Sequence, residues 1–404
     1  MNDFTFLSPT RLIVGRGAEE QTGEWIKRYG GHKVLVHHDS MYCKTSGLVD
    51  KIIGTIQAAG LETVELGCVV PNPHLDLVYS GIKLCRKENV DFLLAIGGGS
   101  VIDSTKAIAM GLKYDGDVWD LFVEENGIPR GMEAEPCMPV GVVLTIAATG
   151  SECSNSCVIT KTDERLKRFC DNDLHRPVFS IENPELTMSL PQFQTACGVI
   201  DVMSHSMERY FSNEAGGNEL TDRLCEAIFS ACMDCGRKLM SNPHDYDARA
   251  SMMVASSLSH NGLTGIGRYN NGDWSSHFIE HELSGEFDVT HGAGLAAIIP
   301  AWMKYVYKEN LPMFLKWATQ VMGVSQDYDN PELTVLEAIR RLEDYFHFLG
   351  IPTTMHEMPG VGIVPEAVMY KMAKRVRITN SNGTVGTLKQ LQTEDIVNIF
   401  RLAQ

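Results

Sequence analysis

Apolar segments and amphipathic segments alternate at regular spacing through the first quarter of this chain. Residues 33–39, 63–67 and 90–96 are short and rich in apolar and β-branched residues, which predicts buried strands. Residues 48–60 and 74–89, which lie between them, have the periodicity of amphipathic helices. Strands joined by helices pair in parallel, because a parallel pair needs a long crossover connection. The sequence therefore predicts an α/β fold with a parallel sheet.

The third of these strands runs directly into a group of glycines. Its sequence, VDFLLAI, is followed by Gly97, Gly98, Gly99 and Ser100, and then by a helical segment. Glycines at such a turn let a diphosphate approach the backbone, and the helix N-terminus supplies N–H donors. The group is not the G-x-G-x-x-G fingerprint, and tight turns also use glycine for purely steric reasons. The context predicts a nucleotide site and leaves the steric interpretation open.

A hydroxyl-rich loop follows the next apolar strand. Residues 138–152 begin with an apolar run and end in a loop that contains Thr145, Thr149 and Ser151. Loops of this kind line phosphates or a nicotinamide amide, and they are equally common as simple Ser/Thr-capped turns. A further strand at 177–186 closes the α/β half of the chain.

The pattern changes near residue 190. From Pro191, which suits the first turn of a helix, one amphipathic helix follows another with few β-branched runs. We therefore predict an α/β domain over residues 1–190 and an all-helical domain over residues 191–404.

The N-terminal residues predict a different local structure. Residues 4–14 are β-rich and interrupted by Pro9, which is typical of two short strands or an edge ribbon. Because edge strands can pair across a two-fold axis, we expect a homodimer.

Carboxylate and imidazole side chains gather early in the predicted helical domain. Asp201 and His205 are four residues apart, His277 and His281 repeat that spacing, and His291 follows. Four residues make about one helical turn, so each pair projects from one helix face. One carboxylate with up to four imidazoles suits Fe²⁺, Zn²⁺, Mn²⁺ or Co²⁺ better than Mg²⁺ or a thiolate-preferring ion. Either pair alone is more often a surface pair or a hydrogen-bonded core group, so spacing leaves both interpretations open.

Charge and hydropathy narrow the possible partners. The net charge is −16, which argues against nucleic acid and anionic membrane surfaces. No run of about 20 apolar residues occurs and no basic start precedes an apolar core, so we expect neither a membrane span nor a secretory signal. Cys232 and Cys235 form the C-x-x-C pair, but a second pair at zinc-knuckle spacing is missing. We therefore expect buried reduced thiols in a cytoplasmic protein.

Taken together, these features make the chain similar to the iron-dependent (group III) alcohol dehydrogenases, especially their butanol dehydrogenase-like branch. The resemblance runs nearly end to end. It is carried by the segments SPTRLIVGRGA, VVPNP, FLLAIGGGSVIDSTKAIA, LTIAATGSECS, GVIDVMSHSMERYF, DWSSHFIEHELSG and VTHGAGLAAIIPAWMKY. It implies a dehydroquinate synthase-like two-domain architecture, with an α/β dinucleotide-binding domain, an all-α C-terminal domain and the active site between them.

The resemblance also implies a metal-ligand set. The family pattern, Asp-x-x-x-His followed by His-x₁₃-His, is met by Asp201, His205, His277 and His291. In the family the intervening histidine, here His281, lies near the metal without binding it. The ligand set is therefore smaller than spacing alone allows.

For the cofactor, the resemblance implies a larger group of contacts. Gly97, Gly98, Gly99 and Ser100 are expected to hold the pyrophosphate with Asp103 beside them. The other expected contacts are Asn72, Thr145, Thr149 and Lys167. Lys167 taken alone reads as a solvated charge.

Two positions depart from the family pattern. NADP-preferring relatives often carry Gly-Gly-Gly-Ser after the first strand, where this chain has Asp39-Ser40-Met41-Tyr42. A carboxylate there would hydrogen-bond a ribose 2′-hydroxyl and repel a 2′-phosphate, so we count Asp39 as a cofactor contact and predict NAD(H) in preference to NADP(H). The usual proline of the small loop is Ala147, which should change the stiffness of the loop more than its chemistry.

The resemblance implies a metal-dependent alcohol dehydrogenase or aldehyde reductase that interconverts a primary, butanol-like alcohol and its aldehyde. Hydride would pass to or from NAD(P)(H), and the metal, Fe²⁺ with Zn²⁺ as the alternative, would act as a Lewis acid. Asp201, as a ligand, and His281, as a proton relay, are the expected catalytic residues. His281 has an equal alternative, in which it only orients a ligand.

Other enzyme classes share parts of this plan. A dehydroquinate synthase-like lyase or a glycerol dehydrogenase-like enzyme would also use a metal and NAD, on a polar substrate. A lyase acting on a phosphorylated substrate would need several Lys and Arg side chains, whereas the metal region offers Arg209 and Arg268 among aromatic residues. A non-catalytic binding protein would lack a ligand, and none is missing.

Overall fold

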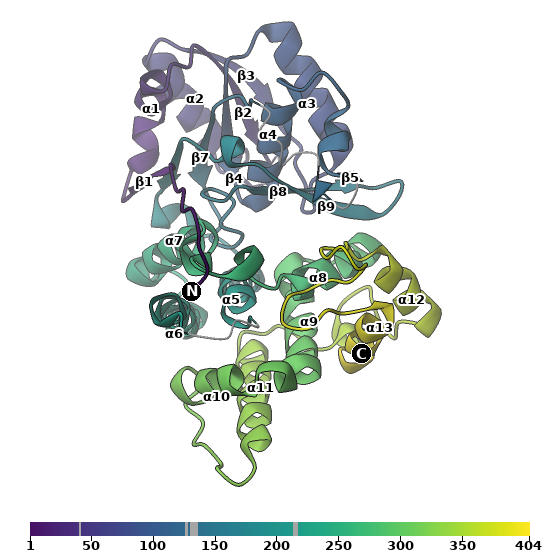
Figure 1. The fold of residues 1–404 in the computed structure, drawn as a ribbon. Helices are drawn as coiled ribbons and strands as arrows, with labels where there is room; N and C mark the ends of the chain where they lie inside the picture. The colour runs from purple at the N-terminus through teal and green to yellow at the C-terminus, as the bar shows by residue number, and fades with distance from the viewer. Residues whose placement is uncertain (40–41, 126–127, 130–135, 213–216) are drawn as a thin grey trace. The chain divides into compact units, whose positions relative to one another are not determined.

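The computed structural model describes the 404-residue chain except residues 40–41, 126–127, 130–135 and 213–216 (Figure 1). It divides into two compact units. The α/β unit consists of Leu7–Leu190 and Pro243–Asn261, and the helical unit consists of Met1–Phe6, Pro191–Asn242 and Gly262–Gln404. A single boundary at residue 190 does not describe this division, because a short segment from each half of the chain belongs to the other unit.

A six-stranded parallel sheet forms the centre of the α/β unit (Figure 1). Its strand order is β1-β10-β7-β4-β2-β3, and every neighbouring pair is parallel. The strands are β1 (Arg11–Val14), β2 (Lys33–His38), β3 (Glu62–Leu66), β4 (Phe92–Gly97), β7 (Val140–Leu144) and β10 (Phe179–Glu182). The predicted parallel sheet is confirmed.

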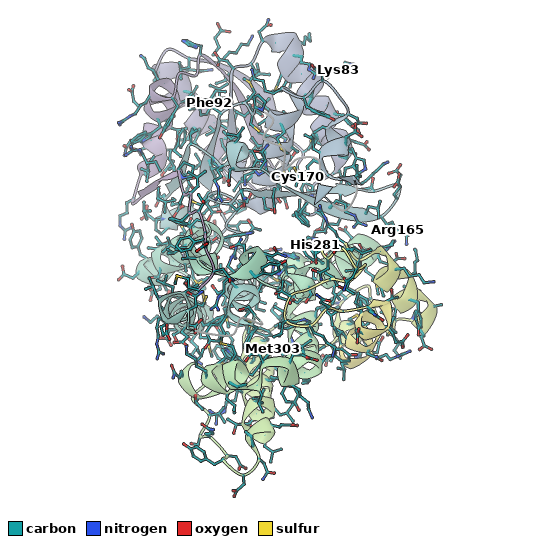
Figure 2. The ribbon with its side chains drawn as sticks, in the orientation of Figure 1. Lys83, Phe92, Arg165, Cys170, His281 and Met303 are labelled. Carbon is teal, nitrogen blue, oxygen red and sulfur yellow. The ribbon has the colours of Figure 1, made fainter. Side chains whose placement is uncertain are left out.

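Helices pack on both faces of this sheet, and each face has its own apolar core. The four helices that follow its strands are α1 (Thr22–Arg28), α2 (Leu48–Ala58), α3 (Leu75–Glu88) and α4 (Gly99–Gly111). On β4, Phe92 and Leu94 pack into the core that contains α1 and α2, whereas Leu93 and Ala95 pack into the core that contains α3 and α4. Figure 2 marks Phe92 on this strand. Burial on both faces explains why the strand reads as a continuous apolar run.

The direction of the strand order reverses between β2 and β4. From β2 the chain crosses through α2 to β3 at one edge, and from β4 it crosses through α4 to β7 on the other side. In open parallel sheets ligands bind outside the carboxyl ends of the strands at such a reversal. The fold therefore singles out the residues that follow β2 and β4.

The N-terminal prediction was wrong in part. Only Arg11–Val14 of residues 4–14 forms a strand, which lies at the sheet edge and pairs with β10. Residues 4–10 form none. Pro9 has no N–H to donate, and Phe4 and Phe6 are exposed rather than packed on a sheet face.

Two small antiparallel sheets complete the strands of the α/β unit. One pairs β8 (Ser156–Lys161) with β9 (Leu166–Asp171), and the other pairs β5 (Glu124–Glu125) with β6 (Ile128–Pro129). Neither was predicted. Through its first strand, the β8–β9 hairpin contacts α4, the helix that follows the glycine group.

Helix α7 (Tyr246–His260) belongs to the α/β unit although both its neighbours in sequence belong to the helical unit. The Arg16 guanidinium lies 3.9 Å from the ring centroid of Tyr246. Ser257 Oγ lies 2.8 Å from Glu152 Oε1 and 2.9 Å from Glu182 Oε1. A helix from late in the sequence thus completes the fold of the N-terminal half.

The helical unit contains the remaining α-helices. They are α5 (Gln192–Tyr210), α6 (Glu219–Ser241), α8 (Ser275–Phe287), α9 (His291–Val306), α10 (Leu311–Gln320), α11 (Pro331–Phe348), α12 (Glu366–Arg375) and α13 (Thr393–Leu402). Met303 on α9, marked in Figure 2, is fully buried in this unit. Cys232 and Cys235 are buried on α6, and burial raises the pKa of the Cys232 thiol. None of the described helices is long and apolar enough to cross a bilayer.

Candidate functional site

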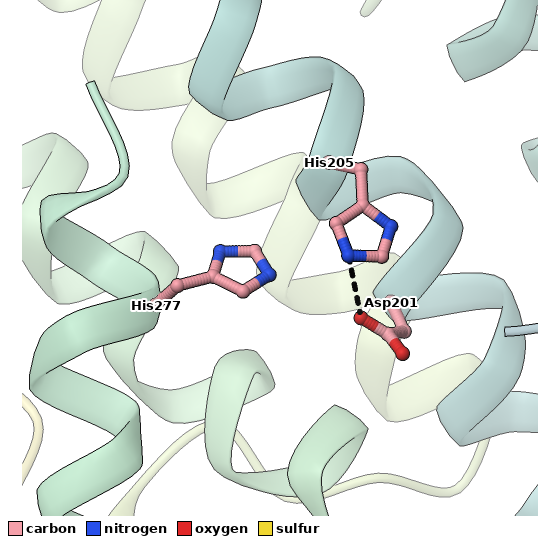
Figure 3. Close-up of side chains that lie close together, drawn as sticks. All are labelled: Asp201, His205 and His277. Atoms are coloured by element: carbon pink, nitrogen blue, oxygen red, sulfur yellow. Dashed lines mark ion pairs between the residues drawn. The ribbon is translucent and has the colours of Figure 1, made fainter. Parts of the chain in front are cut away.

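Helix α5 presents Asp201 and His205 from one face. The helix is buried over most of its length, and the predicted one-turn spacing brings His205 Nε2 to 3.5 Å from Asp201 Oδ1 (Figure 3). Both side chains are buried. Asp201 and His205 each lose their hydration on burial, so both side chains need further partners.

His277 approaches this pair from α8. Its ring lies 5.1 Å from the ring of His205, centroid to centroid, and the two are nearly stacked. The ligand atoms of Asp201, His205 and His277 all lie within 4.8 Å of one another (Figure 3). His277 Nδ1 lies 2.8 Å from Glu208 Oε1, while its Nε2 is buried without a hydrogen-bond partner among the described residues. A buried Nε2 with no partner is the feature expected of a metal ligand.

His291, the first residue of α9, lies beside this group. Its Nε2 is 3.7 Å from Asp201 Oδ1, and its Nδ1 contacts Glu280 Oε2. The four predicted ligands therefore lie together, with Asp201 next to two of the three imidazoles. Glu280, His281 and His291 form a second group whose potential ligand atoms lie within 4.8 Å of one another.

His281 lies one turn after His277 on α8. It is buried, and its ring centroid is 5.7 Å from that of His291 (Figure 2). The structure therefore places His281 next to the ligand group.

Aromatic and cationic side chains surround the group without adding a free positive charge. The ring of Trp274 meets that of His277 edge-on at 5.3 Å, and the Arg209 guanidinium lies 4.5 Å from the Trp274 centroid. Arg209 also donates to the carbonyl of His205, at 3.0 Å. Arg268 forms a buried ion pair with Asp222. Both arginines are therefore held by protein groups.

Two buried carboxylates at this site were missed by the sequence analysis. Glu208 contacts His277, and Glu280 contacts His291. Glu208 follows Asp201 by seven residues, two helical turns along the same face of α5. That spacing could have predicted Glu208 as a neighbour of the site. The contact of Glu280 with His291 depends on how α8 packs on α9, which no spacing predicts.

The predicted cofactor residues belong to the α/β unit, and most of them follow its strands; Asp103 lies on α4 and Lys167 on β9. Asp39 comes after β2, Asn72 after β3, the glycines after β4 and Thr145 after β7. The carboxyl ends of parallel strands meet at one edge of a sheet, so these positions share an edge. The Thr145 N–H donates to the carbonyl of Gly97, at 3.1 Å, and joins two of the turns.

The glycine group allows close packing rather than a left-handed backbone. None of Gly97, Gly98 and Gly99 has a positive φ. A Cβ on Gly99 would stand 2.4 Å from the side chain of Thr149, and one on Gly98 would stand 3.0 Å from Ile146. The hydroxyl-rich loop therefore lies directly against the start of α4. The steric interpretation left open by the sequence holds at these positions, and it is compatible with a phosphate site.

Asp39 has a structural role in the turn that follows β2. Its Oδ1 accepts hydrogen bonds from the backbone N–H groups of Tyr42 and Cys43, the latter at 3.2 Å. Ser40 and Met41 lie outside the described residues. The carboxylate follows β2, at the strand reversal, and stabilises the turn there.

Asp103 and Lys167 are both buried, so the solvated-charge interpretation of Lys167 is wrong. Asp103 accepts hydrogen bonds from Ser151 Oγ, at 2.6 Å, and from the N–H of Val158, at 3.0 Å. Burial raises the pKa of Asp103, while the positive charges of Lys106 and Lys167 oppose the shift. Asp103 thereby ties α4 to the hydroxyl-rich loop and to β8.

Comparison with family models covers nearly the whole chain. Residues 9–184 match the model described as "Iron-containing alcohol dehydrogenase", and residues 195–404 match "Fe-containing alcohol dehydrogenase family, C-terminal".

Individual relatives agree with this result. The chain is 39% identical over 402 residues to NADH-dependent butanol dehydrogenase A of Clostridium acetobutylicum, covering 99% of each chain. It is 31% identical to the NADPH-dependent aldehyde reductase YqhD of Escherichia coli, covering 92% of this chain and 93% of that one. The solved structure of NADH-dependent butanol dehydrogenase A from Thermotoga maritima matches with a TM-score of 0.92 and 33% identity, covering 100% of this chain and 99% of that one. The resemblance inferred from the sequence is confirmed: this chain belongs to the iron-containing alcohol dehydrogenase family, in its butanol dehydrogenase branch.

Proposed function

We propose that this protein interconverts a primary alcohol of about butanol size and its aldehyde, with a divalent metal and NAD(H). The observation that carries the proposal is the buried group of Asp201, His205 and His277 with His291 beside it, in a chain of this family. Clostridium acetobutylicum and Thermotoga maritima relatives are described as NADH-dependent butanol dehydrogenases.

The chemistry of the donor set fits a borderline divalent cation. One carboxylate oxygen and three imidazole nitrogens suit Fe²⁺ or Zn²⁺, and the unpartnered Nε2 of His277 is a buried lone pair that such an ion would satisfy. Asp201, His205, His277 and His291 would hold the ion. When bound, the ion supplies Lewis acidity toward the oxygen of the alcohol or aldehyde.

The side chains around the ligands favour an apolar substrate. Trp274 and Phe278 border the histidines, and Arg209 and Arg268 are occupied by other protein groups. A phosphorylated substrate would need cations that are not already paired. These contacts favour an alcohol dehydrogenase over a lyase of the dehydroquinate synthase type.

His281 is proposed to move the alcohol proton toward water. It is buried next to His291, which puts its imidazole beside the proposed metal site where the alcohol would lose its proton. The alternative role, orienting a ligand, predicts a loss of metal affinity on substitution, whereas a relay predicts a change in the pH profile of kcat.

The cofactor is proposed to bind at the carboxyl edge of the parallel sheet, where it would supply or accept the hydride. The N-terminus of α4 offers N–H groups to the diphosphate, and Asp39 at the strand reversal favours a ribose 2′-hydroxyl over a 2′-phosphate. The negative charge of the Asp39 carboxylate would repel a 2′-phosphate.

Two further features bear on assembly and location. The edge position of β1 suits pairing between two copies of the chain, and we propose a homodimer. Nine of the eleven cysteines are buried, Cys137 is partly buried and Cys68 is exposed. The buried thiols suit a reducing compartment, and we propose the cytoplasm. Light scattering that gives the mass of one chain would refute the dimer.

The test is butanal-dependent oxidation of NADH and of NADPH by protein that is stripped of metal and reloaded anaerobically with Fe²⁺ or Zn²⁺. We expect turnover that requires metal and a higher kcat/KM with NADH. H277A should lower this activity at least about a hundredfold. The alanine supplies no nitrogen lone pair in place of His277 Nε2, so one of the four proposed metal ligands is lost. H347A, in which the substituted histidine lies on α11 and contacts Thr353, is the matched control and should keep it.

Different failures of this test have different meanings. A preference for NADPH would refute the role of Asp39 alone. Absence of turnover with either cofactor, in protein that binds the metal, would refute the proposed reaction.

A further inference from the structure

Glu208 and Glu280 are ionisable side chains without exposed surface that touch the proposed metal ligands. Glu208 is 1% exposed and Glu280 is 0% exposed. Each contacts the Nδ1 of one histidine, His277 and His291 respectively. The proposed reaction uses neither carboxylate directly, so their burial needs another explanation.

The hydrogen bonds around Glu208 show which of its atoms accepts. Glu208 Oε1 lies 2.8 Å from His277 Nδ1, 3.0 Å from the backbone nitrogen of His277, and within hydrogen-bond reach of Ser276 Oγ. The backbone N–H of His277 can only donate, so Glu208 Oε1 is an acceptor in this arrangement. A carboxylate can only accept, so the hydrogen of His277 is on Nδ1 and the lone pair is on Nε2.

Glu280 has the same relation to His291. Its Oε2 contacts His291 Nδ1, and its other oxygen accepts a hydrogen bond from Ser284. His291 Nε2 then faces Asp201, at 3.7 Å. The Nε2 of His277 has no hydrogen-bond partner among the described residues, and the Nε2 of His291 faces Asp201. In each ring a carboxylate contacts the other nitrogen, Nδ1, and so makes Nε2 more basic.

The packing of α9 leaves space for Glu280 at one position. A Cβ on Gly294 would stand 2.5 Å from Glu280 Oε1, 2.9 Å from its Cγ and 3.0 Å from its Cδ. Gly294 has no positive φ, so the backbone does not require glycine at this position. The glycine instead leaves the space that Glu280 occupies. An alanine there would displace the whole carboxylate arm without changing any charge.

We propose that Glu208 and Glu280 are positioning residues that fix the Nδ1–H tautomers of His277 and His291 and so present both Nε2 lone pairs to the metal. The proposal rests on the metal centre of the proposed function. A carboxylate behind an imidazole orients the ring and increases the basicity of the ligating nitrogen, and its loss typically costs 10- to 100-fold in metal affinity.

The test measures metal binding rather than turnover. Zn²⁺ affinity is determined by competition with a chelating dye, and the visible d–d spectrum is recorded after Co²⁺ substitution. For E208Q and E280Q we expect about 10- to 100-fold weaker Zn²⁺ binding and altered Co²⁺ bands, because a glutamine is not anionic. G294A should weaken Zn²⁺ binding in the same direction by moving Glu280.

Glu282 offers a matched control on the same helix. It is 1% exposed, lies 2.9 Å from Arg375 Nε, and belongs to neither group of potential ligands. E282Q removes a buried charge and should lower the thermal stability of the metal-free protein, while its Zn²⁺ affinity stays within about threefold of the wild-type value. E282Q therefore distinguishes a general effect of losing a buried charge from a specific effect on the orientation of the metal ligands.

Three results would overturn the proposal. They are an unchanged Zn²⁺ affinity and Co²⁺ spectrum in E208Q and E280Q, an equal loss of affinity in E282Q, and wild-type affinity in G294A. Wild-type protein that binds metal in this carboxylate-dependent way but oxidises no alcohol would refute the proposed reaction and leave the positioning role intact.

Discussion

At the scale of single residues, one buried proton sits where α7 joins the α/β unit. Ser257 has one hydroxyl hydrogen, yet its oxygen lies within 2.9 Å of carboxyl oxygens of both Glu152 and Glu182. It can donate to only one of them, so the other must donate to it and be protonated. Burial, together with the negative charge of Glu152, raises the pKa of Glu182 to about 8. Burial also raises the pKa of Glu152, and hydrogen bonds from Ser256 and Ser257 and the charge of Lys106 oppose that shift. Because two serine hydroxyls reach Glu152 Oε1, we assign the proton to Glu182.

This proton makes the stability of the protein depend on pH. The folded-state pKa of Glu182 lies above its unfolded value, so the native state binds the proton more tightly and loses stability as pH rises from about 4.5 through about 8. We expect the wild-type free energy of unfolding to fall by a few kcal/mol, to order of magnitude, over that range.

E182Q should flatten this dependence, because the amide does not ionise. Urea unfolding midpoints at several pH values measure the effect. E185Q, at an exposed neighbouring position, is the control and should follow the wild type. A wild-type midpoint that is constant from pH 5 to pH 9 would contradict the assignment of the proton.

The four proposed ligand residues can be picked out from the sequence, whereas the carboxylates that contact them can be found only in part. Helical spacing alone places Asp201 and His205 on one face of α5, because 3.6 residues per turn leaves little freedom. The partnership of Glu280 with His291 joins two helices and needs the absence of a side chain at Gly294. Contacts of that kind depend on packing, which no local pattern encodes.

At the scale of elements, the junction between β4 and α4 is constrained by the loop packed against it. Gly99 has Thr149 where its Cβ would be. G99A should therefore push the loop away from the start of α4, lower the free energy of unfolding by about 1–3 kcal/mol and weaken NADH binding at least about tenfold. Fluorescence titration with NADH and urea unfolding measure the two effects.

Gly54 on α2 is the matched control for this substitution. No atom lies within 4 Å of its Cβ position, and its φ is not positive. G54A should stabilise the protein by about 0.5–1 kcal/mol, because alanine is the better helix former. Equal NADH affinities in G99A and the wild type would contradict the close approach of the loop to the cofactor.

Strand prediction was most direct where both faces of a strand are buried. The half-exposed edge strand β3 was also predicted, whereas the β8–β9 hairpin was not. The apolar runs of β2, β4 and β7 identify them directly, because each is covered by helices on both faces. Strand β9, with the sequence LKRFCD, mixes charged and apolar residues and carries no such run. Residues 4–10 have strand-like composition, but the described structure offers them no sheet neighbour.

At the scale of the whole molecule, the α/β unit is discontinuous in sequence. Glu152 and Thr149 contact Ser257 and His260 of α7, with His260 Nδ1 at 2.8 Å from the carbonyl of Thr149. A chain that ends at residue 190 would leave Glu152 and Glu182 without the serine that separates them. Two adjacent carboxyl groups that lose such a donor destabilise the fold.

We therefore expect residues 1–190 alone to unfold without a cooperative transition. The same residues joined to residues 243–261 through a flexible Gly/Ser linker should unfold cooperatively. Circular dichroism during a urea titration distinguishes the two. Equally cooperative unfolding of both fragments would show that α7 is dispensable.

The position of α7 in the sequence also sets the order in which the two units can be completed during synthesis. Domains are usually completed from the N-terminus as the ribosome releases them. Here the N-terminal unit is still missing a helix when α5 and α6, which belong to the other unit, have already left the ribosome. Glu152 and Glu182 then lack their Ser257 partner until residue 257 leaves the ribosome. During this interval the nascent chain therefore carries two incomplete units at once.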